Sequence, residues 1–277
     1  MKIGVTIEPF EGIPAGHLVP FAHAISLDHI EINVNIMPGI EEVLEKLGKL
    51  TTTFHMPIYF VEGYGPGTKG KKYEKKLSEI ISFINKYHKD LNMLYTLAHP
   101  PESDDETIEL LLERLQQINT PIILENIPWQ KDDEFIAFYN NAKDVLGKQL
   151  AGHAIDAAHR FLTYHEDWLN VPKELIKDIV YVHLQDTSKK QDDHLPLGQG
   201  EMPYKDFLRF LKKNGYKGVI NQEIKPKGLD LVCIMDSCLE ILKIVNKARF
   251  LRLKAKYTIL TPILKRKINK AAETMKS

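Results

Sequence analysis

The sequence predicts an α/β protein that folds as a closed (β/α)8 barrel, followed by a basic helical extension. Three observations support this fold: eight short strand-like runs alternate with longer helical stretches, the strand-like runs are continuously apolar, and the chain has 277 residues. Strands that are buried on both faces of a parallel sheet have such apolar runs, and barrels of this kind commonly need about 250 residues. A doubly wound open sheet is the alternative fold.

The predicted strands recur along the chain from its first residues to residue 224. They are KIGVTI (2–7), HIEINV (29–34), TTTFHM (51–56), MLYTLAH (93–99), PIILEN (121–126), LAGHAID (150–156), IVYVHL (179–184) and GVINQEI (218–224). Helices are expected between them, at about 39–48, 71–89, 104–118, 132–147, 202–215 and 229–248. Apolar residues in 71–89 recur at helical spacing, Ser103 and Glu106 are typical of a capping box, and Gly215 is typical of a helix C-terminus.

The whole chain is neutral, with 37 Lys and Arg against 37 Asp and Glu, but its two parts are oppositely charged. Residues 249–277 hold nine Lys or Arg and one acid, Glu273, which gives +8 and leaves −8 for residues 1–248. We therefore divide the chain into a barrel (1–248) and a basic amphipathic extension (249–277). The sequence contains no apolar run of about 18 residues, so no transmembrane helix is predicted. The acidic N-terminal residues and the two cysteines favour a cytoplasmic location.

The extension is predicted to be an amphipathic helix that packs on protein. One face carries the apolar residues Phe250, Leu253, Tyr257, Leu260, Leu264 and Ile268. Pro262 after Thr261 predicts a break, with Thr261 as the cap of a second short helix. The extension could pack on its own barrel, form a subunit contact in a homo-oligomer, or bind an anionic membrane or nucleic acid. We expect protein contacts, because its surplus charge matches that of the barrel.

The ionisable residues fall where strands of the predicted barrel end. In this fold, functional groups sit at the C-terminal strand ends and in the loops that follow. Nine His, Asp and Glu residues occupy such places: His55, His99, Glu125, Asp156, His159, His183, Asp192, His194 and Glu223. A buried carboxylate is costly, and a divalent cation would hold carboxylates ionised and imidazoles neutral. The sequence therefore predicts a divalent metal site, and its ligand types favour Zn, Mn, Co or Fe.

The other histidines, His17, His23, His29, His88 and His165, are expected to have no part in metal binding, because they fall in loops, helices or a strand start. His153 lies inside a predicted strand and could point toward the site or pack in the core.

Eight segments in order resemble the xylose isomerase-like TIM-barrel superfamily, which includes sugar isomerases and epimerases and AP endonucleases of the endonuclease IV type. They are HIEI with Glu31, FHMPIY with His55, LAHPP with His99, ILEN with Glu125 and Asn126, IDAAH with Asp156 and His159, VHLQD with His183 and Asp186, DDHLPLGQG from Asp192 to Gly200, and NQEI with Glu223. The resemblance covers residues 1 to about 245.

The resemblance implies one to three divalent ions and favours zinc or manganese. In the epimerases a single metal is held by a quartet that matches Glu125, Asp156, His183 and Glu223. In the endonucleases the same quartet belongs to a trinuclear zinc cluster. His55 and His99 would then bind one zinc with Glu125 bridging, and His159, Asp192 and His194 would bind another.

Three features argue against DNA as the substrate. The loop after the second strand is brief, Asp193 stands where the endonucleases usually have Arg, and the barrel is net −8, whereas a duplex-binding face needs Lys and Arg. The Gly-rich loop after the third strand is the exception, because it carries Lys69 and four further lysines. It could be a solvated loop, or a mobile lid that contacts an anion.

We expect a metal-dependent isomerase or epimerase that acts on a small sugar or similar hydroxy-ketone through a metal-stabilised enediolate. Glu125 and Glu223 would exchange protons while also binding metal, and His159 would contact a substrate oxygen. Glu31, Trp129 and Lys69 are candidate substrate contacts. Glu31 could instead orient a ligand or form a structural ion pair, and Trp129 could belong to the core. The alternatives are a zinc-dependent phosphodiesterase acting on abasic DNA, and an inactive barrel that serves as a scaffold.

Overall fold

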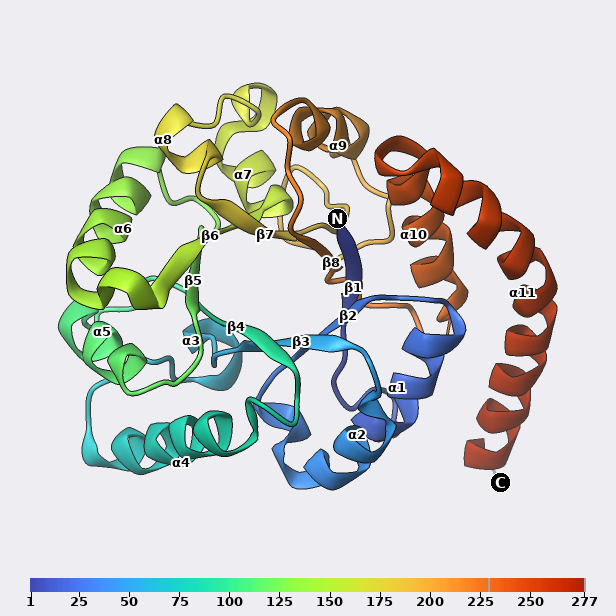
Figure 1. The fold of residues 1–277 in the computed structure, drawn as a ribbon, viewed down its shortest axis with the longest axis horizontal. Helices are drawn as coiled ribbons and strands as arrows, with labels where there is room; N and C mark the ends of the chain where they lie inside the picture. The colour runs from blue at the N-terminus through green and yellow to red at the C-terminus, as the bar shows by residue number, and fades with distance from the viewer. Residues whose placement is uncertain (229, 277) are drawn as a thin grey trace.

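The computed structural model describes residues 1–228 and 230–276 and contains eight parallel strands closed into a barrel (Figure 1). The strands are β1 (Lys2–Thr6), β2 (His29–Ile32), β3 (Thr51–His55), β4 (Met93–Ala98), β5 (Ile122–Glu125), β6 (Leu150–Asp156), β7 (Ile179–His183) and β8 (Val219–Gln222). Each strand pairs with the next, and β8 pairs with β1 to close the ring. The predicted barrel is confirmed, and each predicted run contains one strand.

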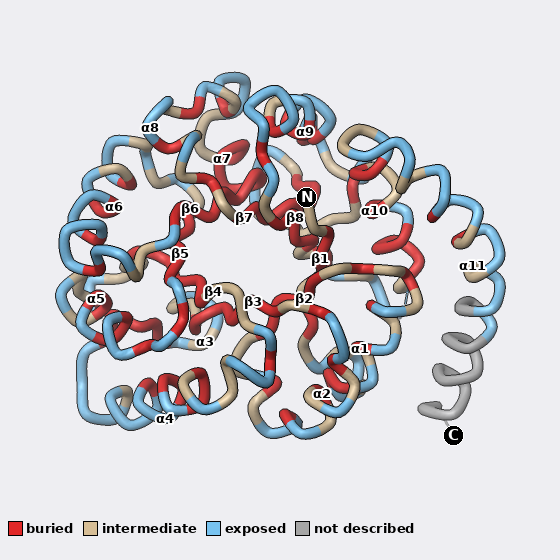
Figure 2. The backbone as a smooth tube through the Cα atoms, in the orientation of Figure 1, coloured by how far each residue is buried: buried red, intermediate tan, exposed pale blue. Residues whose placement is uncertain are grey.

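Residues of the barrel strands are largely buried (Figure 2), as expected for a barrel whose interior is a packed core rather than a channel. A small apolar cluster of Leu97, Ile123, Ala154, Tyr181 and Val219 lies separate from the larger core that packs strands against helices. The hydroxyl of Tyr181 lies 3.1 Å from His29 Nε2 and donates to Glu31 Oε2 over 2.9 Å. These contacts connect the barrel interior to the carboxylates above it.

The helices surround the strands (Figure 1). They are α1 (Ala15–Ala24), α2 (Ile40–Leu47), α3 (Tyr59–Glu62), α4 (Lys71–Tyr87), α5 (Ile108–Gln116), α6 (Asp132–Leu146), α7 (Ala157–Tyr164), α8 (Lys173–Ile176), α9 (Tyr204–Lys213), α10 (Val232–Val245) and α11 (Lys247–Lys276). The capping box predicted at Ser103 is wrong. Thr107 caps α5 by accepting from the amide of Leu110, whereas the carboxylate of Glu106 accepts from the amide of Glu102.

The extension is one helix, so the break predicted at Pro262 is also wrong. The hydroxyl of Thr261 donates to the carbonyl of Tyr257 within the helix and therefore does not cap a new one. A proline costs this helix one amide donor, but the neighbouring side chains of Thr258 and Ile259 are exposed, so water can satisfy the freed carbonyl. The side chains of Leu264 and Ile268 lie outside the described part of the structure.

The first half of α11 packs on its own barrel, beside α10 (Figure 1). Leu253 and Tyr257 are buried, and the Tyr257 hydroxyl donates to the carbonyl of Ile25 over 2.6 Å. Arg249 forms an ion pair with Asp28. The predicted contact with protein is therefore confirmed for residues 249–257, while a subunit contact stays a prediction. Within residues 1–228 and 230–276, the structure holds no helix with the length and hydropathy that a membrane span requires.

Candidate metal centre

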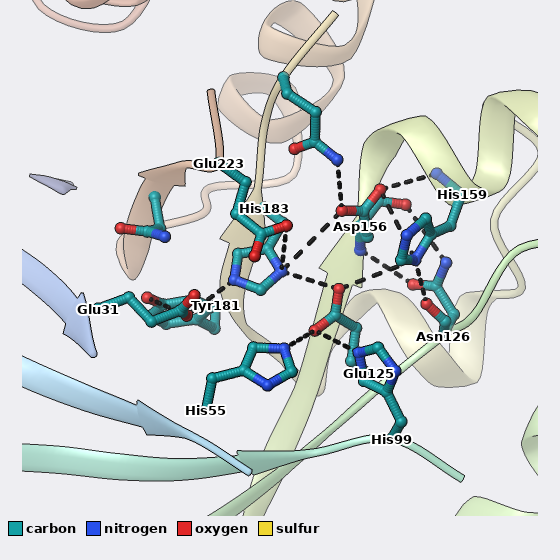
Figure 3. Close-up of polar contacts among 12 residues, drawn as sticks. Glu31, His55, His99, Glu125, Asn126, Asp156, His159, Tyr181, His183 and Glu223 are labelled. Carbon is teal, nitrogen blue, oxygen red and sulfur yellow. Dashed lines mark hydrogen bonds and ion pairs between the residues drawn. The ribbon is translucent and has the colours of Figure 1, made fainter. Parts of the chain in front are cut away.

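All nine predicted ligand residues meet at the C-terminal end of the barrel, seven of them labelled in Figure 3. His55, Glu125, Asp156 and His183 are the last residues of β3, β5, β6 and β7. His99 and Glu223 directly follow β4 and β8, His159 lies in the first turn of α7, and Asp192 and His194 lie in the loop after β7. Parallel strands end at one edge, and this shared edge brings residues that are far apart in sequence into contact.

The carboxylate of Glu125 is the centre of the cluster (Figure 3). Its Oε1 lies 2.8 Å from His183 Nδ1, and its Oε2 lies 3.4 Å from His99 Nε2 and 3.6 Å from His55 Nε2. Glu125 Oε2 and His99 Nε2 are both buried without a hydrogen-bond partner among the described residues. Two ligands at about 2.1 Å from a tetrahedral ion are themselves about 3.4 Å apart. The spacing of these unsatisfied atoms therefore fits a divalent cation.

Four histidines have one ring nitrogen fixed by the protein and the other turned toward the cluster. Each Nδ1 has an oxygen partner: the carbonyl of Met56 for His55 (2.8 Å), the carboxylate of Glu102 for His99 (2.7 Å), the carbonyl of Asn126 for His159 (2.8 Å) and the carbonyl of Glu223 for His194 (3.0 Å). A carbonyl or an ionised carboxylate can only accept, so in each case Nδ1 carries the proton. This arrangement is typical of metal-binding histidines, whose Nε2 is left free for the ion.

Glu31 orients the fifth histidine of the cluster. Its Oε2 lies 2.8 Å from His183 Nε2, and its carboxylate also accepts from the hydroxyls of Tyr181 and Thr6. His183 Nδ1 therefore faces the other carboxylates, with Glu223 Oε2 at 3.6 Å and Asp156 Oδ2 at 3.9 Å. Among the roles open for Glu31, these contacts favour orientation of a ligand.

Asp192 joins a second group of ligand atoms. Its Oδ2 lies 3.2 Å from the Nε2 atoms of both His159 and His194. Asp156 belongs to the same region because its Oδ1 accepts from the His159 amide, and so caps α7, while its Oδ2 accepts from Gln185. The loop that supplies Asp192 and His194 is held by Asp186, which accepts from the amides of three residues in or beside it: Thr187, Gly198 and Met202.

The cluster carries an excess of negative charge. Burial opposes protonation of His183, but the charges of Glu125, Glu223 and Glu31 raise its pKa well above the ordinary value. Burial likewise opposes protonation of His159, and Asp156 and Asp192 nevertheless raise its pKa to about 10. Such histidines take up protons unless another cation satisfies the carboxylates. A divalent cation would displace those protons and neutralise the same charge.

A cavity of about 450 Å³ opens above the cluster. Of the three candidate substrate contacts, Glu31, Trp129 and Lys69, two line this cavity. Glu31 and Trp129 line it, and Trp129 is largely exposed rather than part of the core. Lys69 is absent from the described residues that line it, because its ammonium group donates to the carbonyl of Asp104 over 2.9 Å. The lysine-rich loop is also fixed by Arg114, which donates to the carbonyls of Pro66 and Thr68. The expected role of Lys69 and the mobile lid are therefore not supported.

His153 does not join the metal centre. Its ring packs against Phe135 and Tyr139 of α6, and its Nδ1 donates to the carbonyl of Leu124 over 3.1 Å. Two residues that do support the centre, Glu102 and Gln185, were missed by the sequence analysis. The sequence holds a weak sign of their role: each follows a predicted ligand histidine by two or three residues and carries a hydrogen-bonding side chain.

Known proteins share this fold and its sequence pattern. The family model described as xylose isomerase-like TIM barrel matches residues 20–243. Fructoselysine 3-epimerase of Escherichia coli O157:H7 is 24% identical over 257 residues, which cover 81% of this chain and 90% of that protein.

Two solved structures show the same architecture. A D-tagatose 3-epimerase-like protein superposes with a TM-score of 0.65 at 21% identity, covering 90% of this chain and 99% of the other. The IolI protein with a bound zinc atom gives a TM-score of 0.63 at 15% identity, covering 89% and 99%.

Proposed function

Because the chain belongs to the xylose isomerase-like TIM-barrel family, we propose that it is a divalent-metal-dependent isomerase or epimerase of a sugar or similar hydroxy-ketone. The observation that carries this proposal is the shared orientation of the histidines, each with one nitrogen fixed and the other turned toward buried carboxylates. The similarity to an epimerase and to a zinc-containing protein of the same fold supports it.

The ligand groups would hold one to three ions, with zinc or manganese favoured by the imidazole and carboxylate donors. Glu125, Asp156, His183 and Glu223 would form the first site. His55 and His99 would share Glu125 in a second, and His159, Asp192 and His194 would form a third. When bound, the ion supplies Lewis-acid stabilisation of negative charge on the oxygens of a hydroxy-ketone.

The protein itself would move the protons. Glu125 and Glu223 come from β5 and β8, on different sides of the barrel, and both lie beside His183 Nδ1, at 2.8 and 3.6 Å. A substrate held between them presents one face to each carboxylate. One carboxylate can therefore take the proton from the carbon that bears the hydroxyl while the other returns a proton from the opposite side. His159 Nε2, turned toward the cavity, would contact a substrate oxygen.

The second candidate, a zinc-dependent phosphodiesterase acting on abasic DNA, is favoured only by the third ligand group around Asp192. The cavity argues against it. Lys225 is the sole lysine or arginine among the described residues that line the cavity, whereas Glu8, Glu62 and Glu102 add to its carboxylates. A polyanionic strand needs basic partners for its phosphates, and this surface would repel it.

The proposal can be tested by solvent exchange. The purified protein is analysed for bound metal, then incubated in D2O with D-fructose, D-tagatose and dihydroxyacetone, and deuterium beside the carbonyl is followed by NMR. Exchange is expected with the native protein and is expected to fall to background in Glu125→Gln and Glu223→Gln. Glu109→Gln, an exposed position on α5, is the matched control.

An oligonucleotide with an abasic site is assayed in parallel. Cleavage of this oligonucleotide, together with no exchange on any of the three ketones, would overturn the proposed function in favour of the second candidate.

A further inference from the structure

The rim of the cavity is apolar, although its floor is ionisable. We propose that the substrate is amphipathic: a hydroxy-carbonyl head at the carboxylates and histidines, and an apolar substituent, best an aromatic ring, against the rim. This inference rests on the proposed function for the head group and adds the chemical class of the remainder.

Three strongly exposed apolar side chains lie at this cavity. Among the described residues, the most exposed large apolar side chains include Phe60 (76%), Val61 (69%) and Trp129 (64%), and all three line the cavity. Single exposed apolar residues need no explanation, but a group of them around a concave site marks a binding surface. The cavity volume of about 450 Å³ falls within the range of about 300–1,000 Å³ that encloses drug-sized ligands.

The apolar lining continues from the rim down the wall. Phe10, Leu18, Phe21, Ile224, Leu231 and Ile234 contribute to it. On the same side, the side-chain amides of Asn33 and Asn35 both donate to Glu8 Oε2, so these polar groups satisfy one another. Sugar hydroxyls that face these six apolar side chains would have no hydrogen-bond partner there. An aryl or alkyl group would lose no hydrogen bonds there.

The rim residues are hydrogen-bonded to groups that also contact two histidines of the candidate metal centre. Trp129 has a backbone φ of +63°, a conformation that residues other than glycine rarely adopt. Its amide donates to Thr163 Oγ1, and that hydroxyl donates to the carbonyl of His159. Strained backbone that persists at a cavity is a sign of functional constraint. The strain here keeps an exposed indole at the mouth of the site.

Phe60 has an equivalent attachment on the other side. Its amide donates to Glu102 Oε2, while Glu102 Oε1 accepts from His99 Nδ1. The hydroxyl of Tyr59 also donates to Asp105, which fixes α3 at its first residue. Both apolar rim residues are thus set at a defined distance from the floor, as a substrate with two chemically different ends requires.

Two ketones with the same head group separate the contribution of the head group to binding from that of the apolar substituent. Hydroxyacetone and 2-hydroxyacetophenone both carry a hydroxymethyl ketone, and they differ in a methyl or a phenyl substituent. Their affinities for the manganese-loaded full-length protein are measured by calorimetry. Burying a phenyl ring at the rim should make 2-hydroxyacetophenone bind about 10- to 100-fold more tightly. In Phe60→Ala and Trp129→Ala the ratio of the two affinities should fall below about 3-fold. Leu251→Ala, an exposed apolar position on α11, should keep the full preference.

Equal affinities for the two ketones, or a preference that survives both rim substitutions, would overturn the inference and leave the proposed function intact. If neither ketone binds while deuterium exchange on sugars proceeds, the inference also fails and the proposed function stands. If neither ketone binds and no sugar exchanges, the proposed function fails with it. Because the Trp129 side chain is largely exposed and lies outside the core, Trp129→Ala is expected to fold, which circular dichroism verifies.

Discussion

Acid should destabilise the barrel through His153, because this residue is buried as a neutral imidazole. Burial lowers the pKa of His153 from 6.5 to about 4, against the opposing effect of its hydrogen bond to the Leu124 carbonyl. In the unfolded chain the same imidazole takes up a proton near pH 6.5. As the pH falls from 6.5 toward 4, protons therefore bind the unfolded state preferentially, and stability is lost over that window. Above pH 6.5 the residue is neutral in both states and has no such effect.

The size of this effect follows from the shift. One pKa unit corresponds to about 1.36 kcal/mol, so a shift of 2.5 units, from 6.5 to 4, gives about 3.4 kcal/mol when fully developed. Between pH 7 and pH 5 the loss in the free energy of unfolding is about 2 kcal/mol. His153→Leu removes the titrating group at similar volume, and its stability should fall by about 2 kcal/mol less than that of the native protein over the same interval.

Urea unfolding at a fixed metal concentration measures this difference, since both proteins share every other titrating group. His165→Asn is the control, because His165 is exposed with a φ of +50°, a conformation that Asn tolerates. This variant should follow the native pH dependence. Parallel stability curves for His153→Leu and the native protein would show that His153 is not the buried neutral group described above.

Three further predictions concern the metal centre and the extension. Glu31→Gln should weaken metal affinity about 10- to 100-fold, because it replaces the carboxylate that orients His183. Competition with a chelator measures the affinity, and an unchanged value would contradict this role of Glu31. Deleting residues 249–277 should lower the free energy of unfolding by about 3–6 kcal/mol, the burial value of Leu253 and Tyr257. Urea unfolding measures this loss, and native stability of the shortened protein would refute the assignment. Gly200→Ala places a Cβ 2.5 Å from the Thr187 carbonyl and should lower the free energy of unfolding by about 1–3 kcal/mol. Urea unfolding measures this loss, and native stability would show that the loop adjusts to the added methyl group without cost.

The barrel and the members of the candidate metal centre could be predicted because both depend on strand position. His55, Glu125, Asp156 and His183 end apolar runs, and the closed parallel sheet then carries every run end to one rim. For these features the positions of the strand ends were sufficient. The direction of His153 was left open, although it lies an odd number of residues before Asp156 and alternation along β6 places it on the opposite side.

Contacts between distant segments could not be predicted in the same way. The lysine-rich loop is fixed by Arg114, 46 residues from Thr68, and no local pattern reveals that pairing. The cap of α5 is Thr107 rather than the predicted Ser103, because the Glu106 carboxylate accepts from the Glu102 amide instead of completing a capping box. Helix α11 continues through Pro262 although local propensity favours a break. In each case the chain satisfies its polar groups in a way that the local sequence leaves open.

The ion pair between Arg249 and Asp28 affects the order in which the chain can fold. Asp28 Oδ2 also accepts from the backbone amide of Ile3, so one carboxylate joins β1, the turn before β2 and the start of α11. Arg249 is 221 residues from Asp28, which makes this contact among the least local in the molecule. During synthesis the first strands leave the ribosome long before the helix that fastens them, and contacts this distant form late. Until β8 has been made and has paired with β1, the edge of β1 is open, and the nascent barrel is exposed there to pairing with other chains.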